Sequence, residues 1–334
     1  MIDSHLVTDI PPMIPGEQCW RLPFETSSGR LCLFLRHLPA STPRPGRKRQ
    51  AVLYFNGARL ASAVTVAHRI DGQSWRDDLT ARGFDVWALD YLGYGQSDRY
   101  PQMTQPATAN KALGRIREVT AQVEAALHFI LNRMDLGQLS VLAHSWGSNI
   151  AALVAIRNPA QISKLALFGP VTHRPTPIDA GSSPVVPAWN TITAQEWRKA
   201  FDADVPVGHP PLIPAAQFEE WAAAYLQCDP ESATRTPPAV KVPWGGMADV
   251  LELWGGGKIY DPSEVRAPTL IVRGEWDSYS TDADAHWLFS NLINASQRRD
   301  VKIGMGTHFM FYEPSRFDLY DEVGCFFQGR APAS

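Results

Sequence analysis

The stretch LSVLAHSWGSNIAALVAI, residues 139–156, decides the fold class of this chain. It begins as a short apolar run typical of a buried strand and continues with the composition of a helix. At the junction stands AHSWG (143–147), the pattern G-x-S-x-G with alanine in place of the first glycine. Such a junction holds its serine on a sharp, strained turn and leaves the next N–H free to bind an oxyanion. The motif predicts that Ser145 is a nucleophile, the alternative being a simple turn.

Short apolar runs alternate with helix-period segments on both sides of this stretch, which indicates parallel strands joined by crossover helices and an α/β fold. A hairpin of 19–26 with 30–37 is predicted to open the fold. Further strands are predicted at 51–57, 84–90, 162–170, 267–277 and 299–304. Helices are predicted near 74–83, over 113–134, from about Thr281, and from about Pro314 to Gln328.

The alternation breaks between Val171 and Asp261, where proline-rich connections join short helix-like pieces without convincing strand character. The helix-like pieces are 194–201, 215–227 and 245–254. We therefore predict two parts of the chain: a helical cap (lid) over 172–262, inserted into a core formed by 1–171 and 263–334.

Composition excludes several function classes. The 334 residues include 31 Lys and Arg against 34 Asp and Glu, for a net charge of −3. This balance gives no broad electrostatic reason to bind nucleic acid or an anionic membrane. The one basic run, with Arg44, Arg47, Lys48 and Arg49, is typical of a solvated loop.

The four cysteines are scattered singly, without the spacing of a zinc site, and no dinucleotide fingerprint is present, so neither a metal nor an organic cofactor is expected. The N-terminus lacks the pattern of a signal peptide, and no apolar stretch approaches 18 residues. We expect a soluble, cytoplasmic protein that acts on a small-molecule substrate. The number of subunits is left open, with a homodimer as one option.

A serine hydroxyl needs a histidine base, and the base needs a carboxylate to orient it. On this architecture the expected order is Ser, acid, His. Asp277 closes the apolar run 267–277 at the carboxyl end of a predicted strand, and His308 follows the next predicted strand. Glu275 and Asp282 are rival acids that we rank below Asp277. The alternatives without a catalytic role are that Asp277 caps a helix and that His308 is an ordinary loop residue.

A second oxyanion donor is expected from the loop after the strand at 51–57. This loop reads Asn56-Gly57-Ala58-Arg59. The N–H groups of Ala58 and Trp146 are the predicted oxyanion hole, although Asn-Gly could instead form a tight turn.

Together these motifs resemble the α/β-hydrolase fold family, in its capped branch of serine esterases, lactonases, aminopeptidases and carbon–carbon bond hydrolases. The resemblance covers nearly the whole chain and includes the D-x-x-G-x-G-x-S turn at 90–97. It implies a mostly parallel eight-stranded sheet flanked by helices, with an inserted helical cap. It also implies a triad of Ser145, Asp277 and His308, with Ala58 and Trp146 as oxyanion-hole donors.

The sequence departs from the family pattern in ways that narrow the activity. Asn56-Gly57 stands where members usually carry His-Gly. The His-Gly-Gly-Pro-Gly loop of the proline-specific aminopeptidases is missing, which argues against a peptidase. A serine rather than an aspartate at the nucleophile turn argues against dehalogenases and epoxide hydrolases.

The resulting hypothesis is a serine hydrolase that cleaves a carboxylic ester or lactone of a small to medium, fairly apolar substrate through an acyl-enzyme. One alternative keeps the triad for carbon–carbon or amide bond hydrolysis, or for acyl transfer to a nucleophile other than water. Another is a non-catalytic ligand sensor on the same fold, because fold alone does not decide function.

Candidate substrate-binding residues come from the two loops beside Ser145 and from the aromatic side chains of the predicted cap. Arg59 could meet a substrate carboxylate or could simply be a surface residue. Most of the cap aromatics are expected to pack rather than bind. The candidates are Asn56, Gly57, Arg59, His144, Trp189 and Trp221.

Overall fold

The computed structural model describes residues 5–7, 10, 12–42, 49–174 and 186–330. Arg44, Arg47 and Lys48 of the basic run, residues 175–185 of the predicted cap, and the last four residues of the predicted core therefore lie outside the described residues.

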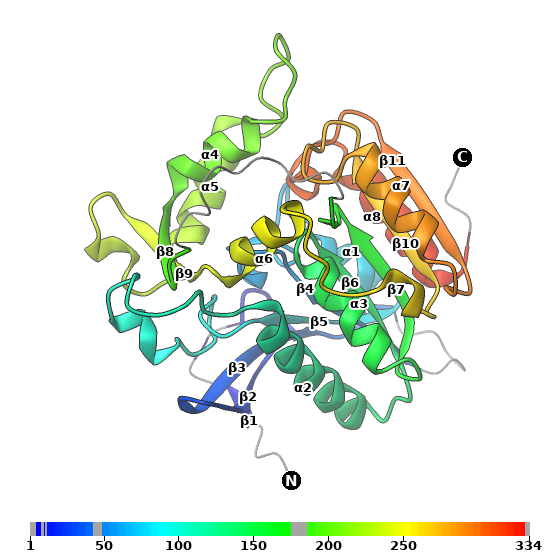
Figure 1. Ribbon diagram of the computed structural model, residues 1–334, viewed down its shortest axis with the longest axis horizontal. Coiled ribbons are helices and arrows are strands. Elements are labelled where there is room, and N and C mark those ends of the chain that lie inside the picture. Colours follow the sequence, from blue (N-terminus) through cyan, green and yellow to red (C-terminus); the bar gives the residue numbers. More distant parts are fainter. Residues whose placement is uncertain (1–4, 8–9, 11, 43–48, 175–185, 331–334) are drawn as a thin grey trace.

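A nine-stranded sheet in the order β1-β2-β3-β5-β4-β6-β7-β10-β11 runs through the centre of the described structure (Figure 1). Its strands β4 to β7, β10 and β11 pair in parallel, and β1, β2 and β3 add an antiparallel edge that joins β5. The strands are β1 His5–Val7, β2 Gln18–Thr26, β3 Gly29–Leu38, β4 Gln50–Phe55, β5 Phe84–Asp90, β6 Leu139–His144, β7 Ile162–Phe168, β10 Thr269–Gly274 and β11 Arg298–Ile303.

The predicted α/β class and mostly parallel sheet are confirmed. Every residue of β5 and of β6 is buried, because both faces of a parallel sheet are covered, and this explains their continuous apolar sequences. The sheet has one strand more than the eight expected, since the three-residue β1 pairs with β2. So short a strand gives almost no periodic signal in a sequence.

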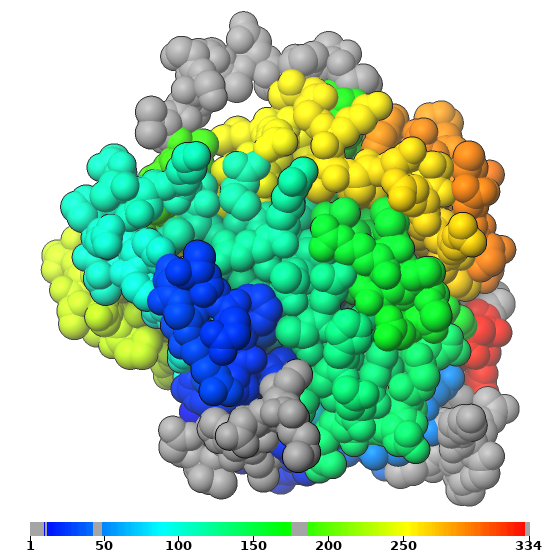
Figure 2. Space-filling view, turned by 60° about the horizontal axis from the view of Figure 1, so that its bottom comes forward, coloured from blue at the N-terminus to red at the C-terminus, as the bar shows by residue number. Residues whose placement is uncertain are grey.

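Five helices flank the sheet: α1 Trp75–Ala81, α2 Ile116–Met134, α3 Gly147–Arg157, α7 Asp282–Asn291 and α8 Arg316–Gln328. In Figure 1, α2 and α3 lie in front of the sheet, and α1 and α8 lie behind it. Figure 2 shows the face on which the surfaces of α2 and α3 lie side by side, with the segment around α6 along its upper edge. No helix within the described ranges is long and apolar enough to cross a bilayer.

The segment between β7 and β10 contains β8 Trp189–Thr193, α4 Ala194–Asp202, α5 Ala215–Leu226, β9 Ala239–Pro243 and α6 Gly245–Trp254. Its three helices lie where they are predicted. The prediction that it has no strands is wrong, because β8 and β9 pair as a small antiparallel sheet. The two partners are five residues long and far apart in the chain, and β9 ends in proline, so neither has a clear strand pattern.

The turn after β5 is fixed by two buried side chains. The Asp90 carboxylate accepts hydrogen bonds from the N–H groups of Ser62 and Gln96, at 2.7 and 3.1 Å. The Ser97 hydroxyl donates to the Asp90 carbonyl oxygen at 2.6 Å and accepts from the Phe34 N–H at 2.7 Å. Ser97 therefore joins the end of β5 to the neighbouring strand β3.

We predict that Ser97→Ala lowers the free energy of unfolding by about 1–3 kcal/mol, because it leaves the buried N–H of Phe34 without an acceptor. Chemical denaturation followed by circular dichroism would measure this loss. Ser41→Ala is the matched control, since Ser41 is exposed, and it should change stability by less than about 0.5 kcal/mol. Equal stability of the two variants would show that the Ser97 hydroxyl is not needed.

Candidate active site

Ser145 lies between the end of β6 and the start of α3, where the chain turns sharply. Its φ is +58°, a left-handed conformation that is uncommon for residues other than glycine. Its N–H donates to the carbonyl oxygen of Phe168 on β7 at 2.8 Å, which ties the turn to the sheet. A Cβ atom at Gly147 would lie 2.5 Å from the carbonyl oxygen of Asn56, so the last position of the motif must be glycine for α3 to approach the sheet.

His308 joins Ser145 to Asp277. Its Nε2 lies 2.8 Å from the Ser145 hydroxyl oxygen, and its Nδ1 lies 3.0 and 2.9 Å from the two Asp277 carboxylate oxygens. Asp277 follows β10, His308 follows β11, and both side chains are buried. One oxygen of Asp277 also accepts from the N–H groups of Tyr279 and Ser280, each at 2.9 Å, which fixes the carboxylate against the imidazole.

The rival acids lie elsewhere. Glu275 is exposed and accepts a hydrogen bond from the Met305 N–H at 3.0 Å. Asp282 is exposed and pairs with Arg273 and Lys302. Thr281, not Asp277, caps the N-terminus of α7. Of the three carboxylates considered from the sequence, the structure brings only Asp277 to His308.

The His308 ring contacts two other rings, those of Tyr279 and His144. Tyr279 stacks on one side with a centroid separation of 4.6 Å, and His144 contacts it at 4.7 Å. The Nε2 of His144 donates to the His308 carbonyl oxygen at 3.0 Å, which fixes the His144 tautomer because a carbonyl can only accept. Burial lowers the pKa of His144 well below its usual range, with His308 adding to the effect, so this ring is neutral. His144 therefore orients His308.

Two N–H groups beside Ser145 are unused. Among the described residues, no group accepts a hydrogen bond from the N–H of Ala58 or of Trp146. Both residues line the same cavity as the Ser145 side chain. A Cβ atom at Gly57 would lie 2.6 Å from the Ser145 Cβ, so only glycine allows the loop this close. The two N–H groups suit an oxyanion formed at Ser145.

The cavity at Ser145 is small and mostly apolar. Its volume is about 20 Å³, which is room for about one water molecule. The segment between β7 and β10 supplies part of its lining, through Trp197 on α4 and through Met247 and Val250 on α6. Any organic substrate must therefore displace part of this lining.

Three predicted substrate-binding residues do not line this cavity. Asn56 is buried, and its side chain holds its own loop by bonding Leu60 and Thr65. The Trp189 indole N–H donates to the Gln105 carbonyl oxygen at 3.0 Å. The indole N–H of Trp221 donates to the carbonyl oxygen of Val64 at 3.1 Å, and its ring stacks on that of Tyr225. These three side chains therefore stabilise the surrounding structure by packing and hydrogen bonding instead of lining the cavity.

Gly57, Arg59 and His144 do line the cavity, as expected, and so do Trp197 and Tyr279, which are not among the six candidates chosen from the sequence. Tyr279 lies two residues beyond Asp277 in a loop that follows a strand end, and this position is the signal that could have identified it. Trp197 carried no comparable signal among the many aromatic residues of its segment.

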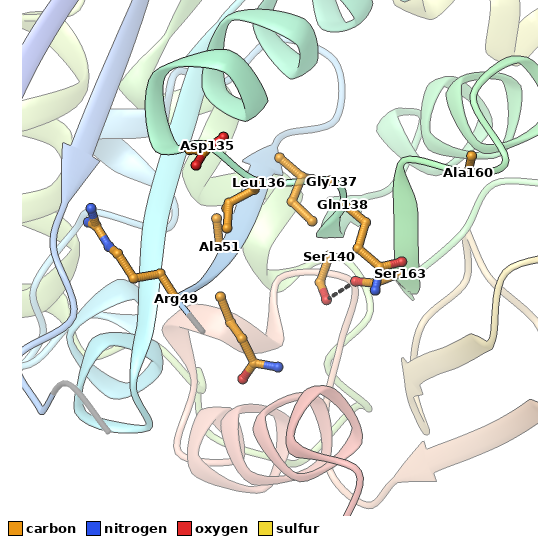
Figure 3. A pocket seen from close by; sticks show the side chains of 11 residues that line it. Arg49, Ala51, Asp135, Leu136, Gly137, Gln138, Ser140, Ala160 and Ser163 are labelled. Atoms are coloured by element: carbon orange, nitrogen blue, oxygen red, sulfur yellow. Dashed lines mark hydrogen bonds between the residues drawn. The ribbon is translucent and has the colours of Figure 1, made fainter. Parts of the chain in front are cut away.

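A larger hollow of about 620 Å³ lies at the other end of the sheet (Figure 3). It is lined by residues at the starts of β4, β6 and β7, whereas Ser145 follows the end of β6. Its two serines, Ser140 and Ser163, bond each other at 2.9 Å, and Arg49, on the opposite side of the hollow in this view, pairs with Asp85. Among the described residues that line this hollow, neither serine is bonded to a histidine, so size alone does not identify the site.

A buried carboxyl group supports the loop that carries His308. Glu313 accepts hydrogen bonds from the N–H of Thr307, at 2.9 Å, and from its hydroxyl. The Thr307 hydroxyl in turn accepts from the Phe309 N–H at 3.1 Å, so the residues on both sides of His308 are fixed. Burial raises the pKa of Glu313 to about 7, against the lowering effect of the Thr307 hydrogen bonds.

Comparison with known proteins agrees with this fold. A family model described as alpha/beta hydrolase fold matches residues 71–315. A probable lysophospholipase of Arabidopsis thaliana, BODYGUARD 2, is 25% identical over 150 residues, which are 45% of this chain and 28% of that protein. The chain thus matches well under two thirds of the length of this curated relative.

Two solved structures share the fold at low identity. A probable hydrolytic enzyme of Pseudomonas aeruginosa superposes with a TM-score of 0.63 and 17% identity, covering 92% of this chain and 93% of that chain. An esterase of Exiguobacterium antarcticum superposes with a TM-score of 0.60 and 14% identity, covering 92% and 98%.

We predict a pH dependence of stability that comes from Glu313. Because its pKa in the folded state, about 7, lies above its usual value of 4.5, the protonated group favours folding. That contribution is complete below pH 4.5 and is lost as the pH rises through 7. Between those limits the free energy of unfolding of the wild type should fall by about 3 kcal/mol relative to that of Glu313→Gln. Each unit by which the pKa differs between the folded and unfolded states is worth about 1.4 kcal/mol.

Urea unfolding of both proteins at several pH values would measure this difference. Glu219→Gln, at an exposed position on α5, is the control and should give a curve parallel to that of the wild type. Parallel curves for the wild type and Glu313→Gln would contradict the prediction.

Proposed function

The chain belongs to the α/β-hydrolase fold family, and from this premise we propose that it is a serine hydrolase that cleaves a carboxylic ester or lactone through an acyl-enzyme. The observation that carries the proposal is the chain of contacts from the Ser145 hydroxyl through His308 to Asp277. Each neighbouring pair lies within hydrogen-bond distance, as nucleophile, base and orienting acid require.

In this proposal, His308 Nε2 takes the proton of Ser145 as the serine oxygen attacks the substrate carbonyl carbon. The N–H groups of Ala58 and Trp146 bind the negative oxygen of the tetrahedral intermediate. When the intermediate collapses, the bond to the leaving alcohol breaks, and His308 gives the proton to that alcohol. Asp277 accepts a hydrogen bond from His308 Nδ1 and stabilises the imidazolium.

Deacylation repeats these steps with water. His308 takes a proton from the water that attacks the acyl carbon, the bond to Ser145 breaks, and the serine oxygen recovers the proton. Released acid and free enzyme complete the cycle. His144 and Tyr279 hold the His308 ring in position throughout, because both rings pack against it.

The proposal includes the segment 172–262 as a cap over Ser145. Its support is that α4 and α6 supply Trp197, Met247 and Val250 to the cavity lining. This lining favours a small to medium, fairly apolar acyl or alcohol group. A cytoplasmic location is also proposed, since the four cysteines are all free thiols, which a reducing compartment maintains.

Fluorophosphonate labelling tests the nucleophile. We expect stoichiometric labelling at Ser145, detected by intact mass and peptide mapping, and none in Ser145→Ala. Turnover of a responsive ester should fall in Ser145→Ala by several orders of magnitude. Ser148→Ala, one helical turn further on, is the matched control and should still be labelled at Ser145. A folded wild-type protein that takes no label would overturn the proposal.

A second substitution tests the acid. Asp277→Asn should lower kcat by roughly 10³–10⁴-fold with little change in KM, because His308 loses the carboxylate that sets its tautomer. Glu275→Gln removes the neighbouring exposed carboxylate and should leave kcat within about twofold, since surface changes away from a site have small effects. Steady-state kinetics of the two variants decide between the acids; the reverse result would identify Glu275.

A further inference from the structure

Arg59 has an unusual backbone beside the candidate oxyanion hole. It directly follows Ala58, and its φ is +79°, a value that costs energy in a residue with a side chain. Its N–H donates weakly to the Tyr94 hydroxyl at 3.4 Å. Strained residues of this kind gather at functional sites, where the surrounding structure enforces them.

The guanidinium of Arg59 lies among aromatic rings rather than carboxylates. Its central carbon lies 4.7 Å from the ring centre of Trp197 and 5.9 Å from that of Trp244. The Nε atom is buried and has no hydrogen-bond partner among the described residues. Ring faces compensate a cation only in part, so the group keeps donors available for an anion.

Other arginines around the site are neutralised. Arg115 pairs with Asp249 of α6, and Arg174 pairs with Asp284 at 3.0 Å. In the described part of the chain, no carboxylate forms an ion pair with Arg59. The Asp277 carboxylate of the same region is already engaged by His308.

Glu196 of α4 is within electrostatic range of Arg59 but does not neutralise it. Its carboxylate is exposed and bonds the N–H and hydroxyl of Thr193, each at 2.7 Å. Those hydrogen bonds are the main reason that its pKa is lowered, with Arg59 a minor contributor. The cavity at Ser145 therefore has a cation in its lining that no carboxylate of the described residues pairs with.

We propose that the substrate of Ser145 carries a carboxylate that pairs with Arg59, separated from the scissile carbonyl by a short chain. The spacing is short because Arg59 adjoins the oxyanion donor Ala58 and lines the same small cavity. The planar fork of a guanidinium matches a carboxylate, and such charge-assisted pairs are stronger than neutral ones. This inference rests on the proposed function and specifies its substrate class as the half-ester of a short dicarboxylic acid.

Monoethyl succinate and ethyl levulinate test the charge alone, since they differ only by a carboxylate oxygen in place of a methyl group. We expect the wild type to hydrolyse monoethyl succinate with a kcat/KM at least about tenfold higher, a typical difference for recognition of a charge. In Arg59→Met that preference should fall to about one, and Arg59→Lys should recover part of it, since a lysine keeps the charge but loses the fork.

Arg198→Met is the matched control. Arg198 also stacks on an aromatic ring, Phe218, but it pairs with Asp202 and does not line the cavity. This variant should keep the wild-type preference. If Arg59 serves only to join α4 to its loop, Arg59→Met will lower kcat/KM for both esters equally and leave the preference intact, which overturns the inference.

Binding to the Ser145→Ala background separates this inference from the proposed function. Isothermal titration calorimetry should show that Ser145→Ala binds monoethyl succinate at least about tenfold more tightly than the double variant that also carries Arg59→Met. The double variant has lost the ion pair between Arg59 and the substrate carboxylate. Ethyl levulinate should show no such difference. Failure of the wild type to hydrolyse either ester, with this binding intact, refutes the proposed hydrolase and leaves the carboxylate site. If monoethyl succinate binds no more tightly than ethyl levulinate, including when neither binds, the carboxylate site is wrong.

Discussion

Ser145 adopts a φ of +58° between β6 and α3, and the positions of the other groups at the site follow from that conformation. A left-handed residue costs on the order of 1–3 kcal/mol, so the surrounding packing must enforce it. Here the β6–β7 pairing, the Ser145 N–H bond to Phe168 and the approach of Gly147 to Asn56 do so. The same turn brings the hydroxyl under the loop of Gly57 and toward His308.

This constraint explains why part of the site could be predicted from sequence. Ser145, Asp277 and His308 each follow the end of a strand of the parallel sheet, and these strand ends gather at one edge. Their order and local contexts are properties of short segments, which a sequence displays directly. Gly57 could also be predicted, because glycine is required there by one close contact with Ser145.

The other features of the fold and the site could not be predicted from the sequence, because they depend on contacts between distant segments. Trp189 and Trp221 have the composition of pocket residues, yet their indole groups bond backbone carbonyls at Gln105 and Val64. The pairing of β8 with β9 joins short segments that lack alternation. Glu313 supports His308 through Thr307, a relation that becomes visible only when the loop is folded. No periodicity marks such residues, since their roles are set by neighbours rather than by position in an element.

The two helices that close the cavity are held to the core by different forces. Asp249 on α6 accepts hydrogen bonds from the Trp146 indole at 3.1 Å and the Ile116 N–H at 2.8 Å, and it pairs with Arg115. Burial raises the pKa of Asp249, so these partners are needed to keep it charged.

Trp197 on α4, by contrast, meets the core through ring contacts with Arg59 and Phe309. Ring contacts are weaker and less directional than buried charged hydrogen bonds, so Trp197 is the part of the lining that yields at lower cost. A carboxylate that engages Arg59 competes directly with that ring. A substrate carboxylate that binds Arg59 therefore also displaces the Trp197 ring, and this opens space for the rest of the substrate.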